Sequence, residues 1–182
     1  VGNGGLIATN DKALKELLLA LRVHGSRSDY HHDHIGLNSR LDALEASVLR
    51  VKLKYLNGWN EKRAQNAAYY KRLFAENGLL DRITLPCTAS GKVHVFNQFT
   101  IRAQKRDQLM VYLKEQEIGH KVYYPVPLHL QECYQPLGYK KGDLPVSEQM
   151  AAEVLSLPIY PELTSSQIEL VVGVIKEFYE NH

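Results

Sequence analysis

The sequence predicts an α/β protein in which two long helices precede a smaller region that mixes strands with helices. Apolar residues recur at helical spacing from about Leu41 to Leu56, and a charged helix that carries tyrosines follows from Trp59 to about Asn77. From Gly78 onward, segments in which apolar and polar residues alternate, as in strands, are followed in turn by segments with helical periodicity. We therefore expect two domains, with residues 1–77 as part of a larger domain and residues 78–182 as a small α+β domain.

Composition and charge narrow the classes of protein that the chain can represent. Of its 182 residues, 45% are hydrophobic and 23% are charged, which is ordinary for a soluble globular protein. A net charge of +2 is too small to indicate nucleic acid or a membrane surface as a partner. No apolar run approaches the roughly 20 residues needed to span a bilayer. The cysteines Cys87 and Cys133 lie far apart and form no CxxC pair, which favours free thiols and a cytoplasmic location.

The segment before the long helices is predicted to contain short elements and turns. Residues 5–9 form an apolar run after a glycine-rich turn and predict a strand, and Asn10 or Asp11 is expected to cap the helix that follows. Residues 26–37 are polar and predict a loop that leads directly into the helix beginning at about Leu41. The apolar surface of that helix is wide, so we expect both its own domain and another subunit to cover it.

The small domain is predicted to end with a proline-marked loop and two helices. Proline cannot donate a hydrogen bond to a β-ladder, so the prolines that follow Tyr124 should end a strand there. A Thr followed three residues later by Gln is the pattern of a capping box at a helix start. The expected elements are a strand at 93–103, a helix at 107–116, a strand at 120–124, a loop at 125–145, a helix from Ser147 to about Leu155, and a last helix that Thr164 and Gln167 cap.

A cluster of histidines is the most visible feature of the polar loop. His24, His31, His32 and His34 lie within eleven positions. Adjacent His31 and His32 cannot both aim easily at one ion, and no cysteine or carboxylate stands at the spacing of a zinc motif. We therefore expect no metal site, and interpret the histidines as solvated or substrate-contacting loop residues.

Asn38 and Arg40 stand where this loop meets the helix. Asn38 occupies a position typical of a helix N-cap, which is its purely structural interpretation. Arg40 carries a planar double donor that suits phosphate or carboxylate, and its structural alternative is a surface ion pair with Asp42 or Glu45.

A third candidate segment runs from Tyr123 to Gln131 and reads Tyr-Tyr-Pro-Val-Pro-Leu-His-Leu-Gln. Its two prolines stiffen the backbone, while tyrosine, histidine and glutamine side chains stay available to a ligand. Groups held in place in this way lose little entropy on binding, so the segment is well equipped to hold a polyhydroxyl ligand. The alternative is a packed loop in which the aromatic residues only fill space.

Together these segments resemble the C-terminal half of the DegT/DnrJ/EryC1/StrS family of PLP-dependent sugar aminotransferases, whose fold is that of aspartate aminotransferase (type I). The resemblance covers essentially the whole chain and rests on several blocks in the same order. These blocks are 2–5, 22–25, 36–42, 124–131, 137–139, 145–148, 155–158 and 161–163. Two departures stand out: Asn3 replaces the acid that is usual in the glycine motif, and Tyr123 stands where many relatives have histidine.

The resemblance implies a role for each candidate residue. Asn38 would reach into the neighbouring subunit of a homodimer and hydrogen-bond the phosphate of PLP, and Arg40 would approach the nucleotide-sugar substrate at the same shared site. Tyr123, Tyr124 and His129 would line the sugar or nucleotide pocket. The lysine that forms the Schiff base is expected upstream of residue 1, so we assign no catalytic residue to this chain, which reads as a fragment.

The reaction implied is transfer of an amino group from an amino-acid donor, glutamate, to a nucleotide-linked keto-sugar in surface-polysaccharide or antibiotic-sugar biosynthesis. The sequences of the loop around His31 and of residues 124–131 are most similar to those of family members that act on UDP-3-keto-uronates. Two alternatives stay open. A PLP-dependent sugar dehydratase of the same fold carries histidine in place of the lysine, and a chain complete as given would be a non-catalytic domain that binds sugar nucleotides.

Overall fold

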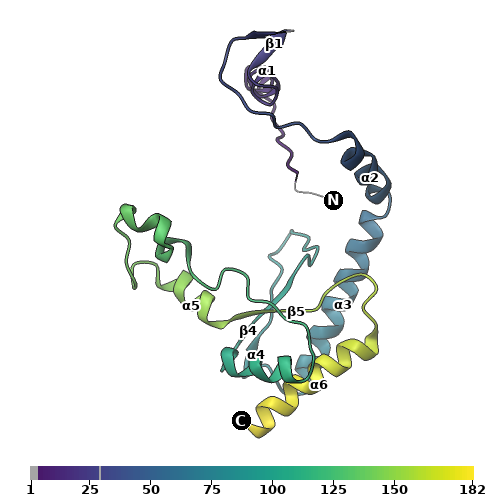
Figure 1. Ribbon diagram of the computed structural model, residues 1–182. Coiled ribbons are helices and arrows are strands. Elements are labelled where there is room, and N and C mark those ends of the chain that lie inside the picture. Colours follow the sequence, from purple (N-terminus) through teal and green to yellow (C-terminus); the bar gives the residue numbers. More distant parts are fainter. Residues whose placement is uncertain (1–3, 29) are drawn as a thin grey trace. The chain divides into compact units, whose positions relative to one another are not determined.

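The computed structural model describes residues 4–28 and 30–182, and the chain divides into two compact units, Val1–Leu56 and Asn57–His182 (Figure 1). Asn3, with the start of the glycine motif, and Asp29 of the polar loop lie outside the described residues. The division falls before the boundary predicted near residue 78. It does so because the helix at residues 56–76 packs into the core of the second unit.

The first unit contains two helices and a short hairpin. The helix α1 spans Lys12–Leu21, and the Asp11 carboxylate caps it by accepting from the Ala13 and Leu14 N–H groups at 2.8 and 3.1 Å, as the sequence predicts. The predicted loop at 26–37 contains two short antiparallel strands, β1 (Ser26–Ser28) and β2 (His31–His32).

The strand predicted at residues 5–9 is wrong. Residues 4–9 form no strand, and the Leu6 and Ile7 side chains are 93% and 70% exposed. An apolar run becomes a strand only when a neighbouring chain segment takes its backbone hydrogen bonds, and the described residues supply no such neighbour here.

The helix α2 spans Ala43–Leu53, and none of its residues, all of which the structure describes, is buried. Its N-cap is Asp42, whose Oδ1 accepts from the Leu44 N–H at 2.8 Å. The structural interpretation of Asn38 as the cap is therefore wrong. The chain turns at residues 54–55, and the next helix, α3, spans Leu56–Glu76.

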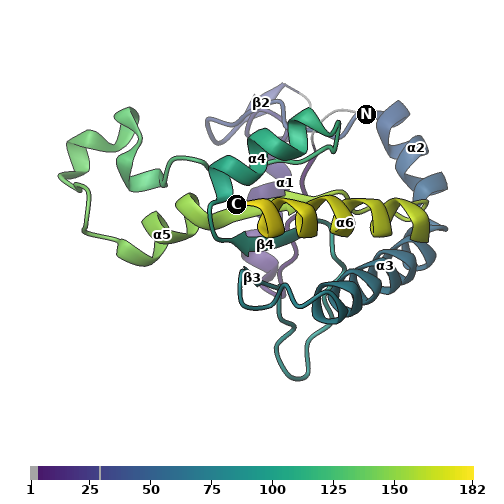
Figure 2. The ribbon, with the colours of Figure 1, turned by 90° about the horizontal axis from the view of Figure 1, so that it is seen from below.

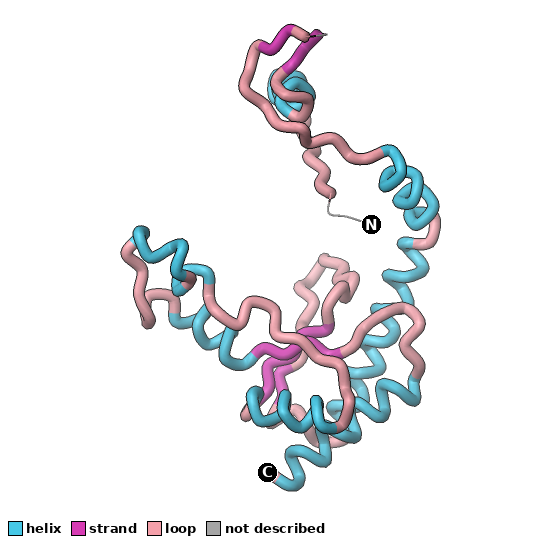
Figure 3. Tube along the Cα trace, viewed as in Figure 1, coloured by secondary structure: helices cyan, strands magenta, loops and turns pink. Residues whose placement is uncertain are grey.

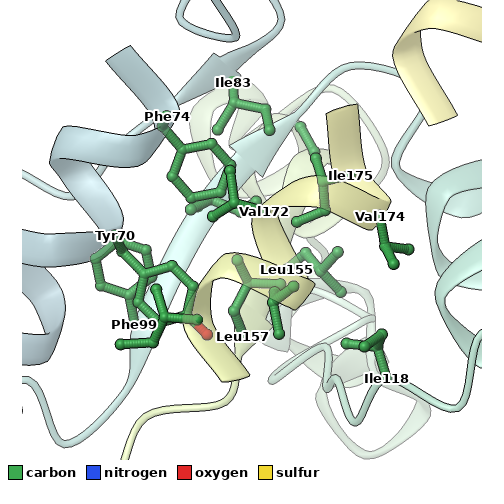
Figure 4. Close-up of a cluster of buried hydrophobic side chains, with 14 of the residues drawn as sticks. Tyr70, Phe74, Ile83, Phe99, Ile118, Leu155, Leu157, Val172, Val174 and Ile175 are labelled. Carbon is green, nitrogen blue, oxygen red and sulfur yellow. The ribbon is translucent and has the colours of Figure 1, made fainter. Parts of the chain in front are cut away.

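The second unit is built on a three-stranded antiparallel sheet in the order β3–β4–β5. The strands are β3 (Ile83–Thr84), β4 (Phe99–Ala103) and β5 (Val154–Leu157). The helices α4 (Arg106–Glu115) and α6 (Ser165–Asn181) cover one face of the sheet (Figures 1 and 2). Alternate residues of β4 are fully buried, and Phe99 stacks on Tyr70 of α3 with ring centroids 4.9 Å apart (Figure 4).

Several strand and helix limits differ from those predicted for this unit. Residues 93–98 are not part of β4, because Phe96 has a positive φ of 47° that interrupts an extended chain. Residues 120–124 contribute only the single bridge between Lys121 and Ser156. The helix α5 spans Pro145–Glu153 rather than beginning after Ser147, since proline suits the first position of a helix. The capping box of Thr164 and Gln167 on α6 is confirmed.

Between the bridge at Lys121 and α5, the chain forms a projecting segment of short helices (Figures 1 and 3). Within the loop predicted at 125–145, it contains the 3-10 helices η1 (Leu128–Leu130) and η2 (Glu132–Leu137). Cys87 and Cys133 are exposed free thiols. Across residues 4–28 and 30–182, no helix has the length and apolar character needed to cross a membrane.

Candidate functional site

Asn38 sits on a backbone segment that is fixed against the end of α1. The His24 N–H donates to the Leu37 carbonyl at 2.9 Å, the Leu37 N–H donates to the Leu21 carbonyl at 2.8 Å, and Asn38 forms a bridge with Val23. These bonds place Asn38 just beyond the end of α1, with its side chain exposed.

Two glycines allow this close approach. A Cβ added at Gly36 would lie 2.3 Å from the Gly25 nitrogen and 2.4 Å from the Leu21 carbonyl oxygen. Gly25 has a φ of +80°, and a Cβ there would lie 1.8 Å from the His34 carbonyl oxygen. The atoms in the way belong to the backbone and cannot turn aside, so both positions require glycine.

Asn38 and Arg40 are joined by a hydrogen bond. The Arg40 Nε–H donates to Asn38 Oδ1 at 3.0 Å, and both side chains are exposed. The Asn38 Nδ2 hydrogens and the remaining guanidinium N–H groups of Arg40 stay available to a ligand. Neither side chain makes a further hydrogen bond or ion pair within the described residues. The pair therefore presents several N–H donors close together, which suits a phosphate or carboxylate.

The four histidines of the polar loop do not gather around a common point. His31 and His32 form β2, and His32 Nδ1 lies 3.2 Å from the His24 carbonyl oxygen. Among the described residues, no group of three or more His, Cys, Asp or Glu side chains could hold a metal ion.

Tyr123 lines a cleft of about 320 Å³ in the second unit, beside β5. Asn97, Gln98, His120 and Lys121 supply most of its other polar side chains, and no carboxylate among the described residues lines it. The cleft therefore offers one lysine cation together with amide, imidazole and phenol groups. Tyr124, the next residue, is 73% exposed with a φ of 59° and does not line this cleft.

His129 is buried inside the projecting segment rather than open to the cleft. Its Nε2 lies 3.0 Å from Glu148 Oε1, and the same oxygen accepts the Gly142 backbone N–H at 2.7 Å. The Gly142 N–H and, more weakly, the His129 imidazole hold the pKa of Glu148 below its usual value. The Tyr139 ring meets the imidazole edge-on, with centroids 6.3 Å apart. Direct contact between His129 and a substrate stays a prediction. In the structure, the hydrogen bond of His129 to Glu148 links η1 to α5.

Sequence reasoning missed Lys121, Asn97 and Glu148. Alternation along residues 120–124 could have placed Lys121 on the same side as Tyr123, because side chains two positions apart share a face of an extended segment. No local pattern indicates that Asn97 lines the same cleft as Lys121, or that Glu148 meets His129, since folding brings each of these pairs near across the sequence.

Comparison with known proteins places the chain beside sugar transaminases. The model of the DegT/DnrJ/EryC1/StrS aminotransferase family matches residues 1–176. A pleiotropic regulatory protein of Geobacillus stearothermophilus is 49% identical over 99% of this chain and 48% of its own length. The dTDP-3-amino-3,4,6-trideoxy-alpha-D-glucose transaminase of Streptomyces venezuelae is 41% identical over 98% of this chain and 46% of its own length.

A more distant relative has a uronate substrate in its name. This UDP-2-acetamido-2-deoxy-3-oxo-D-glucuronate aminotransferase of Pseudomonas aeruginosa is 32% identical over 96% of this chain and 46% of its own length. In each case the chain spans about half the length of the relative that it matches.

Solved structures show the same fold. The crystal structure of S. venezuelae DesV in complex with a ketimine intermediate superposes with a TM-score of 0.87 and 40% identity, over 93% of this chain and 45% of that one. NtdA from Bacillus subtilis, solved with bound cofactor PMP, gives a TM-score of 0.80 at 28% identity, over 94% of this chain and 40% of that one. The predicted α/β fold, that of type I PLP-dependent transferases, is confirmed. The chain belongs to the DegT/DnrJ/EryC1/StrS aminotransferase family.

Proposed function

We propose that this chain forms part of an enzyme that transfers an amino group from glutamate to the keto group of a nucleotide-linked sugar. The observation that carries the proposal is the exposed Asn38–Arg40 pair, which offers several N–H donors close together in a member of an aminotransferase family. The transaminases among the relatives have nucleotide sugars in their names, which supports the substrate class.

The residues present fit the phosphate end of PLP. Asn38 Nδ2 can donate to a phosphate, and the guanidinium of Arg40 beside it adds positive charge. Arg40 fixes the orientation of the Asn38 amide, so the donor is in position before the ligand arrives. When bound, PLP would supply an electron-accepting ring and an aldehyde carbon that carries the amino nitrogen from donor to sugar. No lysine of this chain is assigned the covalent role.

We infer that the site is shared between two subunits of a homodimer. Asn38 and Arg40 would serve the cofactor and substrate of the neighbouring subunit, immediately before α2. The exposure of Leu44, Val51 and Leu53 on α2, at 78%, 57% and 67%, supports a covering surface in the assembled protein. Residues 1–77 would then belong to the large domain and residues 78–182 to the small one, in a cytoplasmic enzyme.

In the second unit, Tyr123, Tyr124 and His129 would line the pocket for the nucleotide sugar. Tyr123 already lines a polar cleft, and Tyr124 presents an exposed phenol next to it in the chain. Of the substrates in this class, we propose a UDP-3-keto-uronate, in line with the named substrate of the P. aeruginosa relative.

The test is transfer of labelled nitrogen by the full-length holoenzyme. Glutamate labelled with a heavy nitrogen isotope is supplied with a panel of UDP- and dTDP-linked keto-sugars. The masses of the sugar products are then measured by mass spectrometry. Heavy nitrogen in the sugar supports the proposal. Loss of water from the sugar without nitrogen gain would identify a dehydratase, and binding without any reaction would identify a non-catalytic domain; either result contradicts the proposal.

A further inference from the structure

The cleft beside β5 differs in charge from the other large groove of the second unit. Two of the three arginines that line the groove along β3 already have acidic partners: Arg102 Nε donates to Glu153 at 2.8 Å, and Arg106 Nε lies 2.6 Å from Asp107 Oδ1. Its charges are therefore largely neutralised from within. The cleft beside β5 has Lys121 and, among the described residues, no lining carboxylate.

Lys121 is held in place by its backbone while its side chain stays unpaired. The Lys121 N–H donates to the Ser156 carbonyl at 3.0 Å, and the Ser156 N–H donates to the Lys121 carbonyl at 2.8 Å. Val122 packs against the hydrophobic core, whereas its neighbours Lys121 and Tyr123 both line the cleft. Within the described residues the ammonium group makes no ion pair or hydrogen bond.

A lone ammonium beside amide and phenol donors is a site for an anion. Asn97 and Tyr123 can donate to the same ligand oxygen atoms that an ammonium attracts, and hydrogen bonds to ionised groups are the stronger kind. The cleft, at about 320 Å³, is at the lower end of the size of small-ligand pockets, so it fits one sugar-sized moiety and not a whole nucleotide sugar.

We propose that Lys121, with Tyr123 and Asn97, forms a subsite for an anionic group of the nucleotide sugar and thereby sets substrate specificity. This inference rests on the proposed function. Two parts of such a substrate carry the required charge, namely a carboxylate at C6 of a uronate sugar and the diphosphate. Lysine is a compact charge on a flexible stem, so it can follow either group.

The experiment measures binding by calorimetry to the full-length holoenzyme, which separates this inference from catalysis. The ligands are UDP-N-acetylglucosamine and the uronate made by oxidising its C6, since the two share nucleotide and diphosphate and differ only in the carboxylate. We expect Lys121→Met to raise Kd for the uronate about tenfold and to leave the other ligand unchanged. Lys121→Arg should retain most of the affinity, because it keeps the charge.

A matched control is Lys114→Met, which removes an exposed lysine of α4 that does not line the cleft. An equal loss of affinity for both ligands in Lys121→Met would support the subsite and assign it to the diphosphate. Unchanged Kd for both ligands would overturn the inference. Failure of the proposed function would show itself separately, as wild-type enzyme that binds these ligands but transfers no nitrogen.

Discussion

His129 Nε2 and Glu148 Oε1 lie 3.0 Å apart, and this pair ties the start of the projecting segment to the helix that ends it. Nineteen positions separate the two residues in the sequence. The Gly142 N–H, which donates to the same oxygen at 2.7 Å, fixes the middle of the segment as well. The Glu148 carboxylate therefore holds two parts of the projecting segment, at His129 and Gly142, against α5.

The pair predicts a dependence of stability on pH. The pKa of Glu148 is held below its usual value by the Gly142 N–H and the His129 imidazole. A carboxylate with a depressed folded-state pKa stabilises the protein above its unfolded pKa of about 4.3, and that contribution is lost as the pH falls through the folded value. Glu148→Gln should therefore lower Tm at neutral pH, with a difference from wild type that vanishes in acid. Calorimetry from neutral to acidic pH checks this.

Glu132→Gln is the control for that series. Its carboxylate is exposed on η2, so its Tm should match wild type at every pH. Equal Tm values for Glu148→Gln and wild type at neutral pH would contradict the fastening role.

Asn38→Ala should weaken retention of PLP with little change in fold. The side chain is exposed and offers one amide donor group to a phosphate, so we expect the Kd of the cofactor to rise about tenfold. Cofactor absorbance after dialysis measures retention, and Asn10→Ala, an exposed asparagine before α1, is the matched control. Unchanged retention would remove the phosphate role.

Arg40→Ala should act mainly on the sugar substrate. We expect KM for the nucleotide sugar to rise about tenfold, while KM for glutamate stays near that of wild type. Arg40 donates to Asn38 at 3.0 Å, so the double variant should lose less cofactor affinity than the sum of the single losses. Steady-state kinetics with each substrate varied in turn give the comparison; equal rises in both constants would rule out this assignment.

Gly36→Ala should destabilise the first unit by more than about 1 kcal/mol, because the added Cβ meets backbone atoms of Gly25 and Leu21. Displacing Asn38 in this way should also weaken PLP retention. Gly58→Ala is the matched control, since a Cβ there meets nothing within 4 Å and the residue lies inside α3. That control should gain roughly 0.5–1 kcal/mol. Urea unfolding curves of the two variants should therefore shift in opposite directions.

Tyr70→Phe should raise the free energy of unfolding by about 1 kcal/mol. The Tyr70 hydroxyl is buried without a hydrogen-bond partner in the described part of the chain, and burial raises its pKa. The adjacent Tyr69 differs, because its hydroxyl has a hydrogen-bond partner and donates to Glu169. Tyr69→Phe should therefore lower stability. A loss of stability in Tyr70→Phe would show that its hydroxyl has a partner in the folded protein.

Helix starts were predicted well where the cap is local. Asp11 lies two and three positions from the N–H groups that it caps, and the Thr164 capping box closes within three residues. Prediction failed where a distant segment must supply the pairing partner. Among the described residues, no strand lies beside residues 5–9, and residues 120–124 pair only with Ser156. Asn38 was a plausible cap by position, but Asp42 lies nearer the first turn of α2 and takes that role.

Motifs that are read along the chain were enough to predict the family, the α/β class and the candidate residues. Tertiary structure alone decided that Arg40 orients Asn38, that His129 is buried against Glu148, and that Lys121 shares a cleft with Asn97. The physical reason is distance along the chain. Periodicity and capping act over a few residues, whereas hydrogen bonds between remote side chains form only after the backbone has brought them within about 3 Å.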